Sequence, residues 1–303
     1  LHYPLRRQRQ MCIRDSHYTG DTYLNLARAV KAAVPEMHIH AFSPLEVWQG
    51  AATLGLPVED FLRRLKAVGL DTLPGTAAEI LDDEVRAIIC PDKLDTAQWL
   101  EVIETAHRVG FTTTATIMFG HVDTPRHWAR HLIRIRDLQR RTGGFTEFVP
   151  LPFVHMEAPM GVRGQSRHGP TFREVRLMHA VARLALHPHI RSIQTSWVKL
   201  GPEGVKACLE GGANDLGGTL MNESISRAAG TQHGQEMPPA AMEALIRSID
   251  RTPRQRSTAY GGVSEDIHAR GMTAAELTPM VLTPPRKRRR EADTNQERFE
   301  YAE

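Results

Sequence analysis

Apolar and polar residues follow one another along the chain in two recurring patterns. Apolar side chains at helical spacing predict helices over residues 23–34, 57–68, 95–110, 124–143, 171–181, 202–211 and 239–249. Short apolar runs between them, rich in β-branched and aromatic residues, predict buried strands over residues 37–42, 70–73, 111–119, 145–153, 190–198 and 213–216.

The predicted helices carry recognisable start and stop signals. Asp95 is followed three residues later by Gln98, and Thr171 by Glu174, and both pairs fit a capping box at a helix start. Gly110 follows the last apolar position of the helix that Asp95 opens. These signals support the boundaries that the periodicity predicts.

Strands that alternate with helices favour an α/β fold with a parallel sheet and helical crossovers. Six strand–helix units at this spacing suit an incomplete (β/α)8 barrel of the TIM type. A doubly wound open sheet is the alternative, but no Gly-x-Gly-x-x-Gly follows the first strand.

Composition excludes several classes of protein. The chain of 303 residues is 41% hydrophobic and 24% charged, and it contains no apolar run long enough to span a membrane and no signal peptide. Its net charge of +3 comes from the two ends, so the body offers no basic surplus for nucleic acid. The three cysteines, Cys12, Cys90 and Cys208, form no Cys-x-x-Cys pair, which fits a reducing cytoplasm.

The two ends of the chain differ from its body. Residues 1–17 lack periodicity and contain a string that looks like translated sequencing adapter, so we expect this segment to be non-native. Residues 262–303 are rich in charged residues, Thr and Pro, with a basic run at 286–290, and we expect a disordered tail. The partial barrel would span residues 18–261.

Polar side chains follow each predicted strand, where barrel enzymes place their active sites. The candidates are His40, Ser43, Glu46, Thr76, Glu79, His121, Asp123, His155, Gln194, Thr195, Ser196, Lys199, Asn214, Asp215 and Glu223. Ser43 and Asp215 could instead be helix caps. His38 and His40 share one strand face and, with His121 and His155, could supply part of the ligand set of a metal-dependent hydrolase.

Six motifs together resemble a known family. They are HIHAFSPLEV (38–47), DTLPGTAAEILDDEVR (71–86), TATIMFGHVDTPRHW (114–128), GGFTEFVPLPFVH (143–155), IQTSWVKLG (193–201) and GANDLGGTLMNESISRAAG (212–230). In this order they resemble the radical S-adenosylmethionine (SAM) enzymes of deazaflavin synthesis. The most similar group is the 5-amino-6-(D-ribitylamino)uracil–L-tyrosine 4-hydroxyphenyl transferases, the tyrosine-cleaving component of FO synthases.

The resemblance implies a radical SAM (β/α)8 barrel that uses SAM and a 4Fe-4S cluster. It implies cleavage of L-tyrosine and transfer of its 4-hydroxybenzyl group to 5-amino-6-(D-ribitylamino)uracil, on the route to FO and coenzyme F-420. Its partners would be an FO-forming radical SAM subunit or domain and an electron donor such as ferredoxin or flavodoxin, with no nucleic acid and no membrane.

The polar candidates take roles within this resemblance by their position alone. Those expected to hold SAM are Ser43, Glu46, Thr76 and Glu79. Those expected to hold the substrates are His40, His121, His155, Thr195, Ser196, Asn214, Asp215 and Glu223.

The chain departs from the family pattern in one decisive way. It contains no Cys-x3-Cys-x2-Cys, the family's cluster motif, so we expect a barrel truncated to strands three to eight that binds no cluster and is inactive by itself. Asn222 and Ser224 are smaller departures, where relatives often carry Glu and Asn. Two alternatives stay open: the menaquinone (futalosine pathway) paralogue of the same family, and a cluster-free barrel that only binds a ligand.

Overall fold

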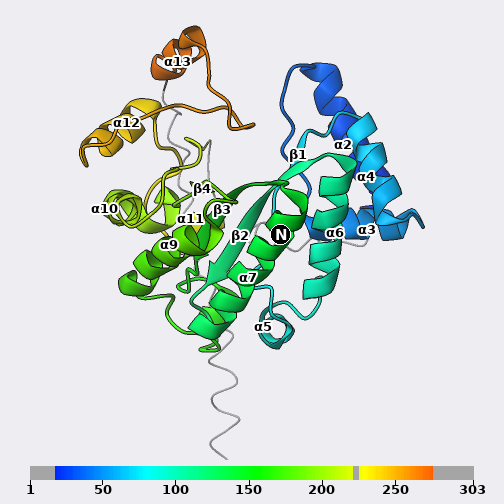
Figure 1. Ribbon diagram of the computed structural model, residues 1–303, viewed down its shortest axis with the longest axis horizontal. Helices are drawn as coiled ribbons and strands as arrows, with labels where there is room; N and C mark the ends of the chain where they lie inside the picture. The colour runs from blue at the N-terminus through cyan, green and yellow to red at the C-terminus, as the bar shows by residue number, and fades with distance from the viewer. Residues whose placement is uncertain (1–17, 221–224, 276–303) are drawn as a thin grey trace, which may run out of the picture.

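The computed structural model describes residues 18–220 and 225–275 (Figure 1). Its strands are β1 (Thr72–Leu73), β2 (Thr112–Phe119), β3 (Phe145–Pro152) and β4 (Ser192–Ile193). Its helices are α2 (Gly20–Ala33), α3 (Pro44–Thr53), α4 (Val58–Ala67), α5 (Asp83–Ile89), α6 (Thr96–Val109), α7 (Pro125–Thr142), α8 (Pro159–Val162), α9 (Phe172–Leu186), α10 (Trp197–Glu210), α11 (Ile225–Ala228), α12 (Pro239–Arg247) and α13 (Glu265–Met272).

The strands form one parallel sheet in the order β1-β2-β3-β4. Isolated parallel bridges extend it on both sides, from His40 to Thr72 and from Gln194 to Asp215. All six predicted strands therefore lie side by side in chain order, although the first and last contribute one bridge each. This confirms the parallel α/β arrangement of a partial TIM-type barrel.

The two faces of the sheet have opposite character. Ala115, Ile117 and Phe119 of β2 are fully buried and belong to the core cluster that also contains Trp99 of α6 and Leu132 of α7. Residues of a strand alternate between faces, so Thr114 and Thr116 point to the other, inward side. The outer face thus carries the core, and the inward face carries polar groups.

The strand β3 continues this pattern after an irregularity. The register jumps between Thr113 and Thr114, so that Thr114 pairs with Glu147 while Phe148 packs into the outer core. Glu147 pairs in turn with Ser192 of β4. A row of polar residues therefore crosses the inward face of the sheet.

The predicted capping signals are confirmed. The backbone N–H of Gln98 donates to Asp95 Oδ1 at 2.7 Å, and that of Glu174 donates to the Thr171 hydroxyl at 3.2 Å. Gly110 ends α6 in the left-handed conformation, where glycine carries no steric cost.

Three elements differ from the sequence-based prediction. The strand expected at 190–198 is short because Trp197 already begins α10, which runs through a kink at Gly201. Ser43 caps α3, as the helix-cap alternative for this residue expected, but the helix that it caps, with Pro44 in its first turn, was not predicted. The short helix α5 is a further element that the periodicity did not predict.

Part of the expected tail is ordered. Helix α13 lies within residues 262–303, and His268 Nε2 contacts Glu243 Oε1 of α12 at 2.7 Å. Residues 1–17 and 276–303, to which the adapter-like segment and the basic run belong, lie outside the described residues.

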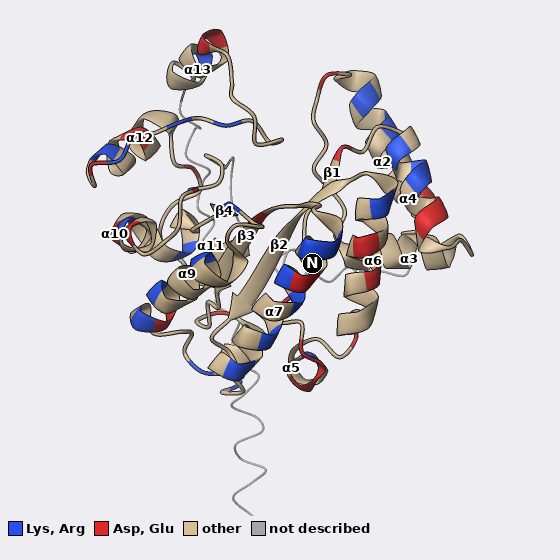
Figure 2. Ribbon diagram, in the orientation of Figure 1, with Lys and Arg blue, Asp and Glu red and all other residues tan. Residues whose placement is uncertain are grey.

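The outer surface carries charges of both signs. Figure 2 shows Lys and Arg interspersed with Asp and Glu over α4, α6 and α7. Across residues 18–220 and 225–275, every helix is too short or too polar to cross a membrane.

The close approach of β1 and β2 depends on Gly75. A Cβ atom there would lie 2.0 Å from the carbonyl oxygen of Thr114, whose hydroxyl accepts a hydrogen bond from the Gly75 N–H at 2.8 Å. We predict that Gly75→Ala lowers the free energy of unfolding by about 1–3 kcal/mol, the usual cost of overpacking, in urea denaturation.

Gly271 in α13 is the matched control, because a Cβ atom there meets nothing within 4 Å. Gly271→Ala should stay within about 1 kcal/mol of the unmodified chain, in the stabilising direction. Equal effects of the two substitutions would contradict the packing described for Gly75.

Candidate functional site

The loop after β1 is held at the carboxyl edge of the sheet by buried charges. Ala77 and Glu79 both have positive φ, at 60° and 44°, which is uncommon for residues with side chains. The buried guanidinium of Arg86 donates to the carbonyl oxygens of Ala77, Ala78 and Leu94. This anchor fixes the strained loop that carries Thr76 and Glu79.

Glu79 forms a buried ion pair with Lys93. The Oε1–Nζ distance is 2.6 Å, and each side chain is 6% exposed. Burial alone would raise the pKa of Glu79, but the neighbouring ammonium of Lys93 holds it below its usual range. The carboxylate is therefore ionised and already has one partner at the edge of the sheet.

The loop after β2 is held by hydrogen bonds to the Asp123 carboxylate. Its carboxylate accepts hydrogen bonds from the backbone N–H of Gly120 and of His121, at 2.9 and 2.6 Å, and from the indole of Trp128. His121 Nδ1 accepts from the Val122 N–H at 2.8 Å, so the ring is neutral, and burial lowers its pKa. Both side chains are satisfied within the chain.

Other predicted site residues also have structural partners. The backbone N–H of Ser43 donates to Glu46 Oε2 at 2.7 Å, which caps α3. His155 stacks on His168 with ring centroids 4.7 Å apart. Asn214 Oδ1 accepts from Arg183 at 2.6 Å.

The last candidates lie beside β4. Thr195 is fully buried, and its backbone N–H donates to the Asp215 carbonyl at 2.9 Å. Ser196 is the residue before α10. Glu223, together with Asn222 and Ser224, lies outside the described residues.

A second polar cluster occupies the amino edge of the inward face. The Arg256 guanidinium pairs with the Asp215 carboxylate through Nε and, at 3.0 Å, through Nη2, and it reaches Glu147 Oε2 at 3.5 Å. It also lies 4.2 Å from the centre of the Tyr260 ring, and the Tyr260 hydroxyl interacts with the Glu147 carboxyl group. Figure 1 shows the segment between α12 and α13 passing over this end of the strands.

His40 completes this end of the sheet. Its Nδ1 lies 2.8 Å from the Thr72 hydroxyl, which also contacts His38 Nε2 at 2.8 Å. Burial lowers the pKa of His40 to about 4, so the ring is neutral at physiological pH. Residues of this cluster enclose a cavity of about 100 Å3, lined by His40, Thr72, Thr113, Thr114, Thr146, Glu147, Arg256, Thr258 and Tyr260.

The structure corrects the positions of His40 and Asp215. Both were grouped with residues that follow the strands, but each forms a parallel bridge within the sheet, and His40 pairs with Thr72 at the amino end of β1. Sequence reasoning also missed Glu147, Arg256 and Tyr260. A usable signal existed, because Glu147 is a charged residue inside an otherwise apolar strand and must find a partner when buried.

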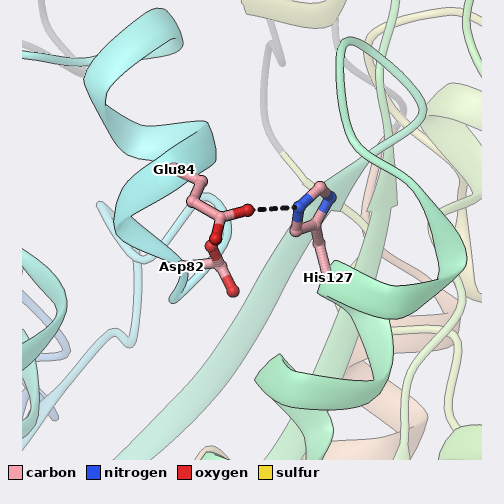
Figure 3. Close-up of side chains that lie close together, drawn as sticks. All are labelled: Asp82, Glu84 and His127. Carbon is pink, nitrogen blue, oxygen red and sulfur yellow. Dashed lines mark ion pairs between the residues drawn. The ribbon is translucent and has the colours of Figure 1, made fainter.

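The metal-hydrolase hypothesis is wrong for the described residues. His38 and His40 lie at one end of the sheet and His121 at the other, and these histidines form no ligand group there. Within residues 18–220 and 225–275, the group with metal-binding geometry is Asp82, Glu84 and His127 (Figure 3).

That group already has cationic partners. Arg130 Nη1 lies 3.0 Å from Asp82 Oδ2 and 3.6 Å from Glu84 Oε1. Arg134 Nη1 lies 3.5 Å from Asp82 Oδ2, so two guanidinium groups offset the two carboxylates. The arrangement is that of a surface ion-pair network between α5 and α7.

Glu147 makes the stability of the chain depend on pH. Burial raises the pKa of Glu147 from 4.5 to about 7. Between these values the folded chain binds more protons than the unfolded chain, so its stability falls as the pH rises through this window. We predict that Glu147→Gln abolishes this loss of stability, which amounts to about 3 kcal/mol at most. Urea unfolding measured across this pH range checks the prediction.

Buried histidines with a lowered pKa change the free energy of unfolding with pH in the opposite direction. Because both chains contain these histidines, comparing Glu147→Gln with the unmodified chain isolates the contribution of Glu147. Glu101→Gln, at an exposed position of α6, is the matched control and should keep the original slope. The same slope for Glu147→Gln would show that this carboxyl group does not titrate in that window.

Comparisons with known proteins show what the chain is similar to. Residues 16–135 match the model of the radical SAM superfamily, and residues 142–267 match that of the CofH/MqnC C-terminal region. The chain is 56% identical over 238 residues to the FO synthase of Mycobacterium leprae, covering 78% of this chain but 28% of that protein. The chain thus spans little more than a quarter of the length of that FO synthase.

A shorter relative is covered far more completely. The 5-amino-6-(D-ribitylamino)uracil–L-tyrosine 4-hydroxyphenyl transferase of Methanothermobacter thermautotrophicus is 49% identical over 262 residues, which cover 86% of this chain and 71% of that protein.

Solved structures show the same fold at low identity. Methylornithine synthase has a TM-score of 0.52 at 12% identity, covering 83% of this chain and 66% of that one. The hydrogenase maturase HydG has a TM-score of 0.56 at 13% identity, covering 83% and 54%. Together with the extent of the match to the archaeal transferase, this places the chain in the radical SAM family of 5-amino-6-(D-ribitylamino)uracil–L-tyrosine 4-hydroxyphenyl transferases and FO synthases.

Proposed function

We propose that this chain is a substrate-binding barrel wall of an enzyme that joins the 4-hydroxybenzyl group of L-tyrosine to 5-amino-6-(D-ribitylamino)uracil. The observation that carries the proposal is the 49% identity to a transferase of that name across 71% of its length. The product would serve FO and coenzyme F-420 synthesis. The menaquinone-pathway alternative is less well supported, because the curated relatives described above are FO synthases and this transferase.

The inward face of the sheet supports a role in binding polar substrates. Thr114, Thr116 and Glu147 point to this side, while the apolar core lies behind the sheet. A reacting pair of molecules held there would be shielded from bulk water by the strands and by the segment after α12. The chain's own task is then to orient the substrates.

Two loops at the carboxyl edge are proposed to hold SAM. Thr76 and Glu79 lie on the strained loop after β1, and Ser43 and Glu46 lie at the start of α3. The fixed backbone of the first loop offers a preformed contact surface, whereas Glu46 is engaged by the backbone of Ser43. Glu79 is likewise engaged, by Lys93 at 2.6 Å, so we favour Thr76 for this role.

The cysteines described in this chain do not fit an iron–sulfur cluster. Cys90 follows α5 and Cys208 lies within α10, and both are buried in separate elements of the fold. When bound, SAM and a reduced 4Fe-4S cluster supply the radical chemistry of the family. We propose that the cluster ligands are not among the residues of this sequence.

The proposed reaction needs two substrates, an electron donor and a second enzyme unit. L-Tyrosine and the ribitylaminouracil are the substrates, and a ferredoxin or flavodoxin is the proposed electron donor, in the cytoplasm. A second radical SAM unit would convert the product into FO. The chain covers 28% of the FO synthase of Mycobacterium leprae, which leaves ample length in such relatives for this second unit.

A chimera tests the proposed function directly. We predict that the archaeal transferase with its matching region replaced by residues 18–261 of this chain couples L-tyrosine to the ribitylaminouracil, as followed by mass spectrometry. The same chimera carrying Glu101→Gln, at an exposed position, should form as much product.

A folded chimera with an intact cluster that forms no coupled product would refute the transferase assignment. If that chimera still bound the uracil, the barrel would be a ligand-binding protein. Turnover of the futalosine-pathway substrate in place of the uracil would instead select the paralogue.

A further inference from the structure

The cavity at the amino edge of the inward face has no role in the function proposed so far. Its walls are Thr72, Thr114 and Glu147 on three neighbouring strands. Its cover is the segment that carries Arg256, Thr258 and Tyr260. The cavity therefore depends on a contact between the sheet and residues more than 40 positions beyond its last strand.

The lining of the cavity matches hydroxyl groups. Threonine and tyrosine hydroxyls both donate and accept hydrogen bonds, and a carboxylate accepts while a guanidinium donates. Glu147 Oε2 lies at a long 3.5 Å from Arg256 Nη2, which leaves acceptor capacity toward a ligand. Such a mixed set of donors and acceptors suits several hydroxyls on adjacent carbons.

The size and charge of the cavity restrict the ligand further. Its volume of about 100 Å3 has room for a chain of several water-sized groups. The carboxylate of an amino acid is disfavoured, because Glu147 and Asp215 outnumber the single guanidinium of Arg256.

We propose that this cavity binds the end of the ribityl chain, and that Glu147, Arg256 and Tyr260 select the substrate by its terminal hydroxyls. This inference rests on the proposed function and adds a specificity site to it. The uracil ring would then lie further along the inward face, toward the carboxyl edge and Thr116. The three residues act as binding groups, remote from the bond that forms.

Calorimetry with two probes tests the assignment on the full chain. The probes are 5-amino-6-(D-ribitylamino)uracil and 5,6-diaminouracil, which lacks the ribityl chain. We predict that Tyr260→Phe and Glu147→Gln each weaken binding of the ribityl compound about tenfold, the worth of one good hydrogen bond. Binding of diaminouracil should stay within about twofold of the unmodified chain, which is about 0.4 kcal/mol.

Tyr18→Phe and Glu101→Gln are the matched controls, since both side chains are exposed and distant in sequence from the cavity lining. They should leave both affinities unchanged. Thermal unfolding of each variant checks that it folds, and because the two test variants alter different elements, a folding defect in one leaves the other informative.

The outcomes separate the two levels of the proposal. If the unmodified chain binds both probes and neither variant changes the preference for the ribityl compound, the cavity assignment fails and the proposed function stands. Equal weakening of both probes by the two variants also rejects the cavity assignment. If the unmodified chain binds neither probe, the cavity assignment fails, and product formation by the chimera decides the proposed function separately.

Discussion

Buried charge on the inward face of the sheet is the constraint on which the rest of this structure depends. Glu147 of β3 and Asp215, on the strand segment beyond β4, project into a space with little solvent, where an unpaired carboxylate is costly. Arg256 supplies the compensating charge from a segment that follows α12. The electrostatic requirement therefore ties this late segment to the amino edge of the sheet and creates the cavity there.

The opposite face of the sheet is organised by a different force. Phe148, Ile117 and Trp99 are fully buried among the helices α6, α7 and α9, where removal of apolar surface from water stabilises the fold. Strand alternation assigns each residue to one face or the other. Replacing one polar residue by another on the inward face can therefore change ligand binding without removing apolar contacts from the core on the outer face.

Much of the fold follows from local sequence patterns, and the site does so only in part. The capping pairs at Asp95 and Thr171 and the periodic strands β2 and β3 gave reliable boundaries, because those interactions lie within a few residues of one another. Helix α3 was missed, although Ser43 was named as a possible helix cap, because a Ser-Pro dipeptide can end a strand or begin a helix. Arg256 and Tyr260 were missed, because their partners lie on strands far away in the sequence.

The central claim is that the inward face, closed by the segment around Arg256, binds the ribitylaminouracil. Hydrogen–deuterium exchange of the full chain with and without this compound tests it most directly. Slower exchange in residues 253–262 and in β3 on addition of the compound is the result that the claim predicts. Protection confined to the loops at the carboxyl edge, with no change in these two segments, would contradict it.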